Sequence, residues 1–340
     1  MNLFELTRHL VDIESITANE RQVERFLHGH LSPLAARYQG RLERLEVEPE
    51  RFNLFASWGD PLVTLSTHMD TVPPFFPARE DDEFICGRGA CDAKGIISAM
   101  VFAAERLLAG GVRNFGLLFL VGEERNSAGA KAAARTSRGS RFLINGEPTE
   151  NRIALASKGA LRYEIVARGR MAHSSYPELG LSAIETLLDV LQDLRGIPLP
   201  EDALLGRCTL NIGTISGGRA PNVVPDSAQA EIMFRLVGEA KPLQDAVIAA
   251  AAGRAEAREI LSTPAVRLGS FDGLPTTVVS YTTDIPFLAD AWGKPFLIGP
   301  GSIHVAHTDE ERVPKRHLEE AVEIYSRMVR QLLGAAKGNG

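Results

Sequence analysis

The sequence predicts an α/β protein in which a second, smaller domain is inserted into the first. Strands and helices alternate to about residue 157, an order typical of an α/β sandwich. From residue 158 to residue 268 the order changes to β-α-β-β-α-β, which is the order of a ferredoxin-like domain. The first pattern then resumes. We therefore expect a discontinuous domain of residues 1–157 and 269–340 around an insert of residues 158–268.

Apolar periodicity and end signals locate the elements of the first domain. Helices are predicted at 1–10, 18–38, 93–109 and 315–333. Apolar runs predict strands at 41–48, 52–58, 62–67, 117–121, 142–144, 276–281 and 295–298. Thr17 and Glu20 form a capping-box pattern before the second helix, and Gly110-Gly111 ends the third.

The insert has fewer regular segments than the first domain. Strands are predicted at 161–167, 207–213, 228–236 and 263–268, and helices at 181–194 and 242–257. The third strand alternates, with Ala230, Ile232 and Phe234 on one face, so one side of its sheet should be buried.

Composition indicates a soluble globular protein. A net charge of −6 and the lack of a basic stripe argue against a nucleic-acid partner. No apolar stretch is long enough to cross a bilayer, and the N-terminal helix carries charges throughout, unlike a signal peptide. The three cysteines include no CxxC pair, which argues against a disulfide framework or a zinc ribbon. We expect a cytoplasmic protein without a membrane partner.

His68 and Asp70 follow directly after the apolar run at 62–67. Residues two apart in an extended chain point to the same side. A metal-bound imidazole usually donates its second ring nitrogen to a carboxylate, and this pair would provide that arrangement. A His-x-Asp pair alone, however, does not distinguish a metal site from an ordinary turn.

Other metal-binding residue types also follow apolar runs. They are Asp92 before the helix at 93–109, Glu123 and Glu124 after 117–121, Glu147 after 142–144, and His304 and His307 after 295–298. Ligands of open α/β sheets bind outside the carboxyl ends of the strands. Each acid alone is compatible with an exposed turn, but the set predicts one converging site.

Five motifs carry a family resemblance. They are Ser66-Thr67-His68-Met69-Asp70-Thr71-Val72-Pro73, Gly87-Arg88-Gly89 with Asp92-Ala93-Lys94-Gly95, Glu123-Glu124, Gly146-Glu147-Pro148-Thr149, and Ala306-His307. They resemble the motifs of a di-zinc amidohydrolase family that includes acetylornithine deacetylase, succinyl-diaminopimelate desuccinylase, aminoacylases and carboxypeptidase G. The resemblance covers nearly the whole chain. It implies a zinc-exopeptidase-like catalytic domain and an inserted lid domain that also forms a homodimer.

The resemblance implies a role for each matching residue. His68, Asp92 and Glu147 would bind one zinc ion, and Asp92, Glu124 and His307 the other, so that Asp92 bridges them. Cobalt is a possible substitute. His304 competes with His307 for the last position, and the Ala-His pair favours His307.

Two further residues complete the implied catalytic set. Asp70 would orient His68, and Glu123 would be the general base. Adjacent side chains at a strand exit point apart, so Glu124 can bind metal while Glu123 faces the attacking water.

Three residues of the insert are candidates through the resemblance. Alone, His173 and Asn222 have the features of turn residues, and Arg235 those of a surface strand residue. In the family, the matching histidine reaches a partner's active site and stabilises the oxyanion. The position of Arg235 commonly binds a substrate carboxylate, and Asn222 would contact the substrate.

The predicted function is metal-dependent hydrolysis of an N-acylated amino acid, of the deacetylase type found in amino-acid biosynthesis. A di- or exopeptidase of the same family is the alternative for this small-molecule or short-peptide substrate. A non-catalytic binding relative is the alternative of another class, although no ligand position is missing. The sequence contains no Gly-x-Ser-x-Gly elbow, which argues against a serine esterase.

Overall fold

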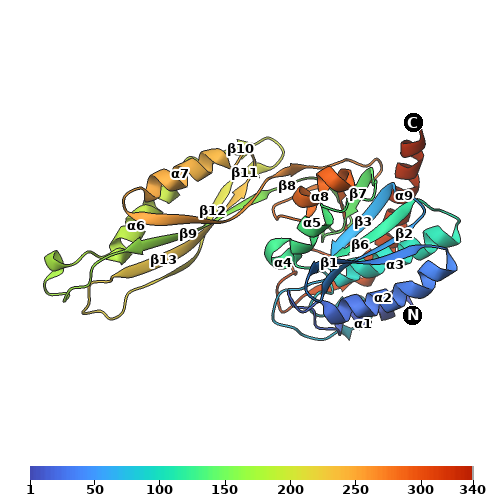
Figure 1. Cartoon of the computed structure of the whole chain (residues 1–340), viewed down its shortest axis with the longest axis horizontal. Coiled ribbons are helices and arrows are strands. Elements are labelled where there is room, and N and C mark those ends of the chain that lie inside the picture. Colours follow the sequence, from blue (N-terminus) through green and yellow to red (C-terminus); the bar gives the residue numbers. More distant parts are fainter. Residues whose placement is uncertain (339–340) are drawn as a thin grey trace. The chain divides into compact units, whose positions relative to one another are not determined.

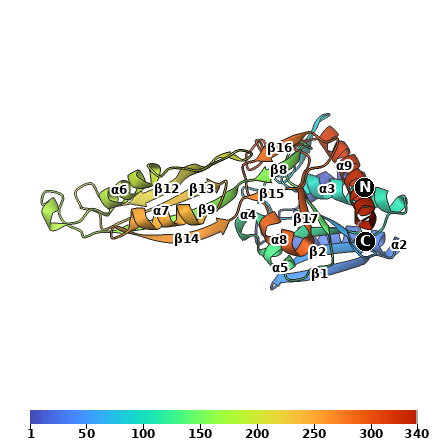
Figure 2. The same ribbon diagram turned by 90° about the horizontal axis from the view of Figure 1, so that it is seen from above.

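A computed structural model describes residues 1–338, and these residues form two compact units. Unit 1 comprises residues 1–155, 268–277 and the chain from Thr283 onward. Unit 2 comprises residues 156–267 and 278–282. Figures 1 and 2 show the elements of both units from two perpendicular directions.

Unit 1 is built on a mixed β-sheet. Its strands, in spatial order, are β1 (Arg41–Glu48), β2 (Arg51–Trp58), β6 (Phe115–Leu120), β3 (Val63–His68), β7 (Phe142–Asn145), β17 (Lys294–Leu297) and β8 (Ile153–Ser157). The four strands β6, β3, β7 and β17 are parallel to their neighbours within this group, and the flanking pairs are antiparallel. A small separate sheet joins β18 (Arg312–Pro314), β5 (Phe84–Cys86) and β4 (Arg79–Glu80).

Helices cover both faces of the larger sheet. One group contains α1 (Leu3–Val11), α2 (Arg21–Arg37), α3 (Lys94–Ala109) and α9 (Lys315–Gly338). The other contains α5 (Ala128–Ala133) and α8 (Ile285–Trp292). Alternation along β6 explains the two cores, because Leu117 packs in the core of the first group and Leu118 in that of the second. The predicted α/β architecture is confirmed.

Unit 2 contains a four-stranded antiparallel sheet with the order β12-β13-β9-β14. These strands are β12 (Thr209–Gly217), β13 (Ser227–Leu236), β9 (Gly159–Arg168) and β14 (Ala255–Thr263). The helices α6 (Ala183–Arg195) and α7 (Lys241–Ala251) pack on the sheet. Smaller elements are η1 (Pro177–Leu179), β10 (Glu201–Asp202), β11 (Gly206–Arg207), β15 (Val266–Arg267) and β16 (Thr276–Val279), the last of which begins in unit 1. The chain order β9-α6-β12-β13-α7-β14 is the predicted ferredoxin-like order.

The structure corrects two details of the sequence analysis. The predicted capping box is wrong, because α2 begins at Arg21 without a side-chain cap, and the hydroxyl of Thr17 donates to Asp70 instead. The predicted helix 242–257 is too long. It ends at Ala251, and Ala255–Thr263 form β14, which pairs with β9, so the insert's last sheet strand lies earlier than the predicted 263–268.

None of the helices in the described part of the chain combines the length and apolar character that a membrane crossing requires.

Candidate metal and catalytic site

The carboxyl ends of three neighbouring parallel strands carry most of the candidate residues of unit 1. His68 is the last residue of β3, and Glu147 lies two residues beyond β7. Glu123 and Glu124 open the short helix α4 (Glu123–Asn126), which follows β6 through Gly122 with φ +78°. Parallel strands end at the same edge of a sheet, so these side chains converge.

Asp92 has one carboxylate oxygen on each side of this cluster. Its Oδ1 lies 2.8 Å from His68 Nε2, which is 4.0 Å from Glu147 Oε2. Its Oδ2 lies 3.4 Å from His307 Nε2, which is 3.0 Å from Glu124 Oε1. Two ligand atoms of a tetrahedral zinc ion with bonds of about 2.0–2.2 Å lie about 3.3–3.6 Å apart. The observed separations bracket that value.

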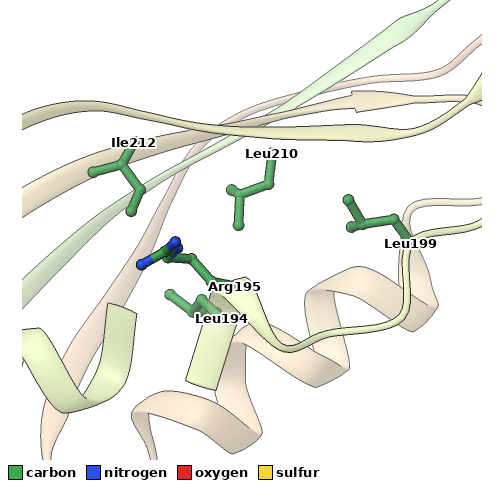
Figure 3. A pocket seen from close by; sticks show the side chains of 5 residues that line it. All are labelled: Leu194, Arg195, Leu199, Leu210 and Ile212. Atoms are coloured by element: carbon green, nitrogen blue, oxygen red, sulfur yellow. The ribbon is translucent and has the colours of Figure 1, made fainter. Parts of the chain in front are cut away.

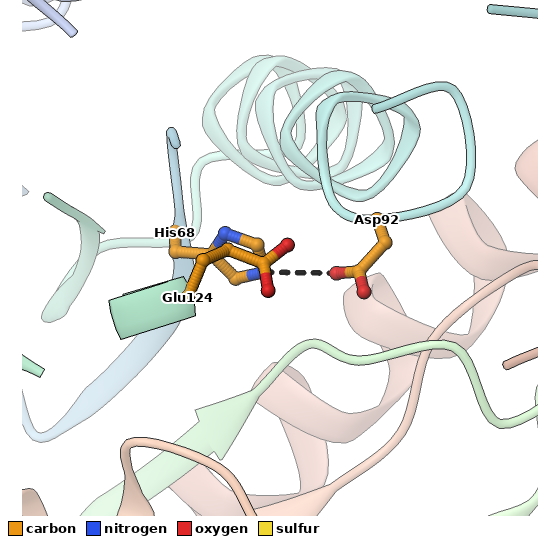
Figure 4. A group of neighbouring side chains, drawn as sticks. All are labelled: His68, Asp92 and Glu124. Carbon is orange, nitrogen blue, oxygen red and sulfur yellow. Dashed lines mark hydrogen bonds and ion pairs between the residues drawn. The ribbon is translucent and has the colours of Figure 1, made fainter. Parts of the chain in front are cut away.

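The two sides of the cluster are contiguous. Possible ligand atoms of His68, Asp92 and Glu124 all lie within 4.8 Å of one another, although the resemblance assigns His68 and Glu124 to different ions. Figure 4 shows the three side chains pointing toward a common space.

Charge and hydrogen bonding in the cluster fit a bound cation. Glu147 Oε1 is buried and has no hydrogen-bond partner among the described residues. Desolvation and the neighbouring carboxylates raise the pKa values of Glu123 and Glu147 well above their ordinary range. A divalent cation would supply the missing positive charge, and imidazole with carboxylate is a donor set that zinc prefers.

His307 is the most exposed of the candidate ligands, with 47% of its side chain accessible. Its hydrogen bonds to Asp92 and Glu124 raise its pKa to about 10, so the ring must lose a proton before it can bind metal. Its backbone is in the left-handed region, with φ 62°, which is unusual for a residue other than glycine. His304, by contrast, is exposed and forms no hydrogen bond or ion pair with any described residue.

Asp70 links the histidine to the glutamate pair. The Nδ1 of His68 donates to the backbone carbonyl oxygen of Asp70 at 3.0 Å, so Nε2, which is hydrogen-bonded to Asp92, is the nitrogen that a neutral ring would offer to a metal. The Asp70 carboxylate lies 3.6 Å from the same nitrogen. It accepts the backbone N–H groups of Glu123 at 3.1 Å and Glu124 at 3.2 Å, and the hydroxyl of Thr17 at 2.8 Å. Sequence reasoning missed these last three contacts.

The two adjacent glutamates have different surroundings. The Glu124 carboxylate is hydrogen-bonded to His307, whereas the Glu123 carboxylate has no hydrogen bond to a described residue. Glu123 is therefore free to act on another molecule.

Two buried acids that the sequence analysis did not select also lie near the cluster. Asp284 precedes α8 and is buried, and this burial raises its pKa to about 7. Glu311 contacts the loop that carries Asp92. Neither residue occurs in a recognisable local pattern.

The remaining candidates lie in unit 2. His173 is exposed, and its Nδ1 accepts the N–H of Ser175 at 3.1 Å, so a neutral ring carries its proton on Nε2. The N–H of Ser174 donates to the backbone carbonyl of Asn222 at 3.0 Å, which brings the loops of His173 and Asn222 together. Arg235 is half-buried on β13, and its guanidinium has no hydrogen bond or ion pair with any described residue.

Comparison with known proteins gives one family. Residues 64–331 match the model described as peptidase family M20/M25/M40. A peptidase M20 domain-containing protein of Schizosaccharomyces pombe is 39% identical, over 96% of this chain and 84% of the relative. A probable carboxypeptidase of Aspergillus terreus is 38% identical, over 95% of this chain and 84% of the relative.

Solved structures agree in fold. An M20 family metallo-carboxypeptidase from Sulfolobus solfataricus matches 96% of this chain and 98% of its own, with a TM-score of 0.79 and 16% identity. The aminopeptidase PepT from Bacillus cereus matches 97% and 98%, with a TM-score of 0.78 and 20% identity.

Proposed function

Because the chain belongs to peptidase family M20/M25/M40, we propose that it hydrolyses the amide bond next to an amino acid that has a free α-carboxylate. The family consists of metallohydrolases, so the enzyme class predicted from the motifs is confirmed. A non-catalytic binding role is correspondingly disfavoured. The metal, the substrate and the residue roles below are parts of the proposal.

Two zinc ions, replaceable by cobalt, occupy the cluster in this proposal. The ligands are His68, Asp92 and Glu147 for one ion and Asp92, Glu124 and His307 for the other. The bound ions supply Lewis acidity, which polarises the scissile carbonyl and lowers the pKa of a water molecule. Support comes from the two-sided position of Asp92 and from the unpartnered oxygen of Glu147.

Glu123 is the general base. Its carboxylate lacks a protein partner and lies beside a proposed ligand, so it is available to take a proton from the attacking water and to pass it to the leaving nitrogen. Asp70 holds the backbone of Glu123 and the ring of His68 in place.

His173 donates a hydrogen bond to the oxyanion that forms on the scissile carbonyl. Its exposed ring has a free Nε2–H when neutral, which is the donor that this role requires. As in the related family members, the donor acts on the site of a partner subunit.

The proposed homodimer forms through unit 2. Nine of the ten large apolar residues that the described chain exposes belong to this unit, among them Leu188 and Ile215. The edge strand β12 is free on one side, and a pocket between it and α6 is lined by Leu194, Arg195, Leu199, Leu210 and Ile212 (Figure 3). Exposed apolar groups beside an unpaired strand favour association with a second copy. A cytoplasmic location remains a prediction.

Arg235 carries the substrate proposal. A half-buried guanidinium without a carboxylate partner is costly, and desolvation lowers its pKa. The nearby Arg162, by contrast, pairs with Glu231. A substrate α-carboxylate would satisfy Arg235 with two parallel hydrogen bonds. Asn222 is the second substrate contact in this proposal.

Two finer substrate classes share this carboxylate. A deacylase removes a short acyl group from the α-nitrogen of an amino acid, and a carboxypeptidase removes the C-terminal residue of a peptide. The stretch Gly299-Pro300-Gly301-Ser302-Ile303 resembles that of acetylornithine deacetylase and favours the first, with ornithine-like and lysine-like substrates as leading candidates. The relatives named probable carboxypeptidases favour the second.

The decisive experiment compares free and amidated substrates of matched structure. N-acetyl-ornithine, N-acetyl-lysine and dipeptides ending in the same residues are assayed with the zinc-loaded and cobalt-loaded protein, each beside its α-carboxamide. Arg235→Lys should lower kcat/KM on the free acids by about 10- to 100-fold, because a point charge cannot reproduce the two-pronged contact. The amides should be poor substrates and should not respond to the substitution.

Arg162→Lys is the matched control, because it changes another arginine of the same sheet that already has an acidic partner. Equal rates on acids and amides would overturn the carboxylate proposal and indicate a broader peptidase.

A further inference from the structure

Glu311 is a fully buried carboxylate that faces the loop carrying Asp92. Its Oε1 accepts three backbone N–H groups, from Gly89 at 2.9 Å, Asp92 at 3.1 Å and Cys91 at 3.2 Å. Its Oε2 accepts a hydrogen bond from Arg88 Nη1 at 2.6 Å. One side chain therefore holds four donors of a single loop.

Within the described chain, these three backbone N–H groups have no other acceptor. The loop lies between β5 and α3 and has neither a strand partner nor a helix turn to satisfy them. Buried backbone donors are almost always paired, and Arg88 is itself buried and needs a counter-charge. The conformation of this loop thus depends on Glu311.

The backbone of Glu311 also connects the two proposed metal sites. Glu311 lies four residues after His307, and its backbone carbonyl accepts the N–H of Gly87 at 3.0 Å. The next residue, Arg312, begins β18, which pairs with β5 just before the Asp92 loop. The segment that carries His307 is therefore anchored on the backbone that carries Asp92.

We propose that Glu311 is a positioning residue that sets the distance between the two metal sites. It holds the backbone of Asp92 so that one carboxylate oxygen faces His68 and the other faces His307. This inference rests on the proposed bridging role of Asp92. It extends that role to a residue that contacts neither substrate nor metal.

The test is metal binding by the full-length Glu311→Gln protein. A glutamine keeps the size but has a single oxygen, so it cannot serve both the backbone donors and Arg88. Partners that orient metal ligands typically contribute about 10- to 100-fold to metal affinity. We expect zinc affinity, measured by chelator competition, to fall by that factor for at least one of the two ions. The visible spectrum of the cobalt-loaded protein should change as well.

Glu20→Gln is the matched control. Glu20 is an equally buried glutamate of unit 1, is paired with Arg51, and forms no hydrogen bond or ion pair with residues 87–93 in the described chain. This variant should lose thermal stability while keeping the parental zinc affinity and cobalt spectrum. Glu311→Asp provides a second variant should the glutamine protein fail to fold, because it keeps the charge but shortens the reach, and it should show the same loss of affinity.

The outcomes separate this inference from the function proposal. Parental zinc affinity and an unchanged cobalt spectrum in a folded Glu311 variant would overturn the positioning role. If Asp92→Asn also leaves the zinc stoichiometry and affinity unchanged, the bridging role itself fails, and with it the proposed site.

Discussion

At the scale of single residues, the different surroundings of Glu123 and Glu124 support the different functions proposed for them. The two side chains leave adjacent backbone positions, both of which are held by Asp70. The Glu124 carboxylate is hydrogen-bonded to His307, whereas the Glu123 carboxylate has no hydrogen bond to any described residue. Both residues are glutamates, so only the direction in which each carboxylate points can distinguish a metal ligand from a group that transfers protons.

Glu123→Gln should therefore retain both metal ions and lose turnover. The substitution preserves size but removes the proton acceptor, and a positioned general base contributes about 100- to 10,000-fold. Metal analysis of the purified protein and a turnover assay provide the two measurements. Glu124→Gln is the control and should lose metal. The opposite pattern, with metal lost only from the Glu123 variant, would reverse the assignment.

The candidate ligands could be selected from the sequence because each follows an apolar run or lies in a short motif, as His68 and Glu147 do. Glu311 could not be selected, because its partners are mainly backbone N–H groups some 220 positions earlier in the chain. Backbone donors leave no trace in a sequence pattern. The contacts of Asp70 with the glutamate backbone were missed for the same reason.

At the scale of elements, a buried ion pair fixes the start of α2 against β2. Arg51 donates to both carboxylate oxygens of Glu20, at 2.6 and 3.0 Å, and only 12% of the Arg51 side chain and 1% of the Glu20 side chain are accessible. This pair replaces the cap that the sequence predicted for Glu20. Burial of both partners makes the loss of one costly.

Arg51→Met should lower the free energy of unfolding by about 3–5 kcal/mol, because it leaves the Glu20 carboxylate buried and unpaired. Urea unfolding measures the change. Arg21→Met removes an exposed ion pair with Glu50 near the same end of the helix, and it should cost only about 0–1 kcal/mol. Similar losses in the free energy of unfolding for the two variants would show that the buried Glu20–Arg51 pair stabilises the protein no more than an exposed pair does.

The error in the insert also belongs to this scale. Alanine-rich residues around Ala249 favour a helix locally. The only strong signal for the end of this helix in the sequence is Gly253, which adopts φ +71°. The strand that follows pairs with β9, nearly a hundred residues earlier in the chain. A long-range pairing of this kind overrides local propensity. Longer elements with a regular apolar face, such as α3, were located within a residue or two.

At the scale of the whole molecule, the proposed catalytic set is divided between two units of the chain, with the metal cluster in unit 1 and His173 in unit 2. Sequence order predicted the presence of both units. It could not predict whether His173 serves its own chain or a partner, because that depends on assembly.

His173→Ala should lower turnover by about 100- to 1,000-fold, in line with the loss of one oxyanion donor, and should leave the zinc content unchanged. Mixing this variant with Glu123→Gln tests the partner hypothesis. Hybrid dimers contain one site with both functional groups, so part of the activity should return. No recovery, in a mixture shown to exchange subunits, would contradict action across the dimer.

The pairing at the root of the insert has a consequence for how this protein family can vary. The N–H of Leu268 donates to the carbonyl of Leu155 at 3.0 Å, so the two ends at which residues 156–267 leave and rejoin unit 1 are hydrogen-bonded to each other. Within unit 2, Ala160 and Thr263 are likewise direct partners in neighbouring strands. The insert is therefore a long loop of unit 1 whose two ends lie next to each other. The entropy cost of closing such a loop grows only slowly with its length. Changes of length between these paired residues should therefore leave the parallel strands β6, β3, β7 and β17 intact, so the edge that carries the proposed metal ligands and the inserted domain can evolve at different rates.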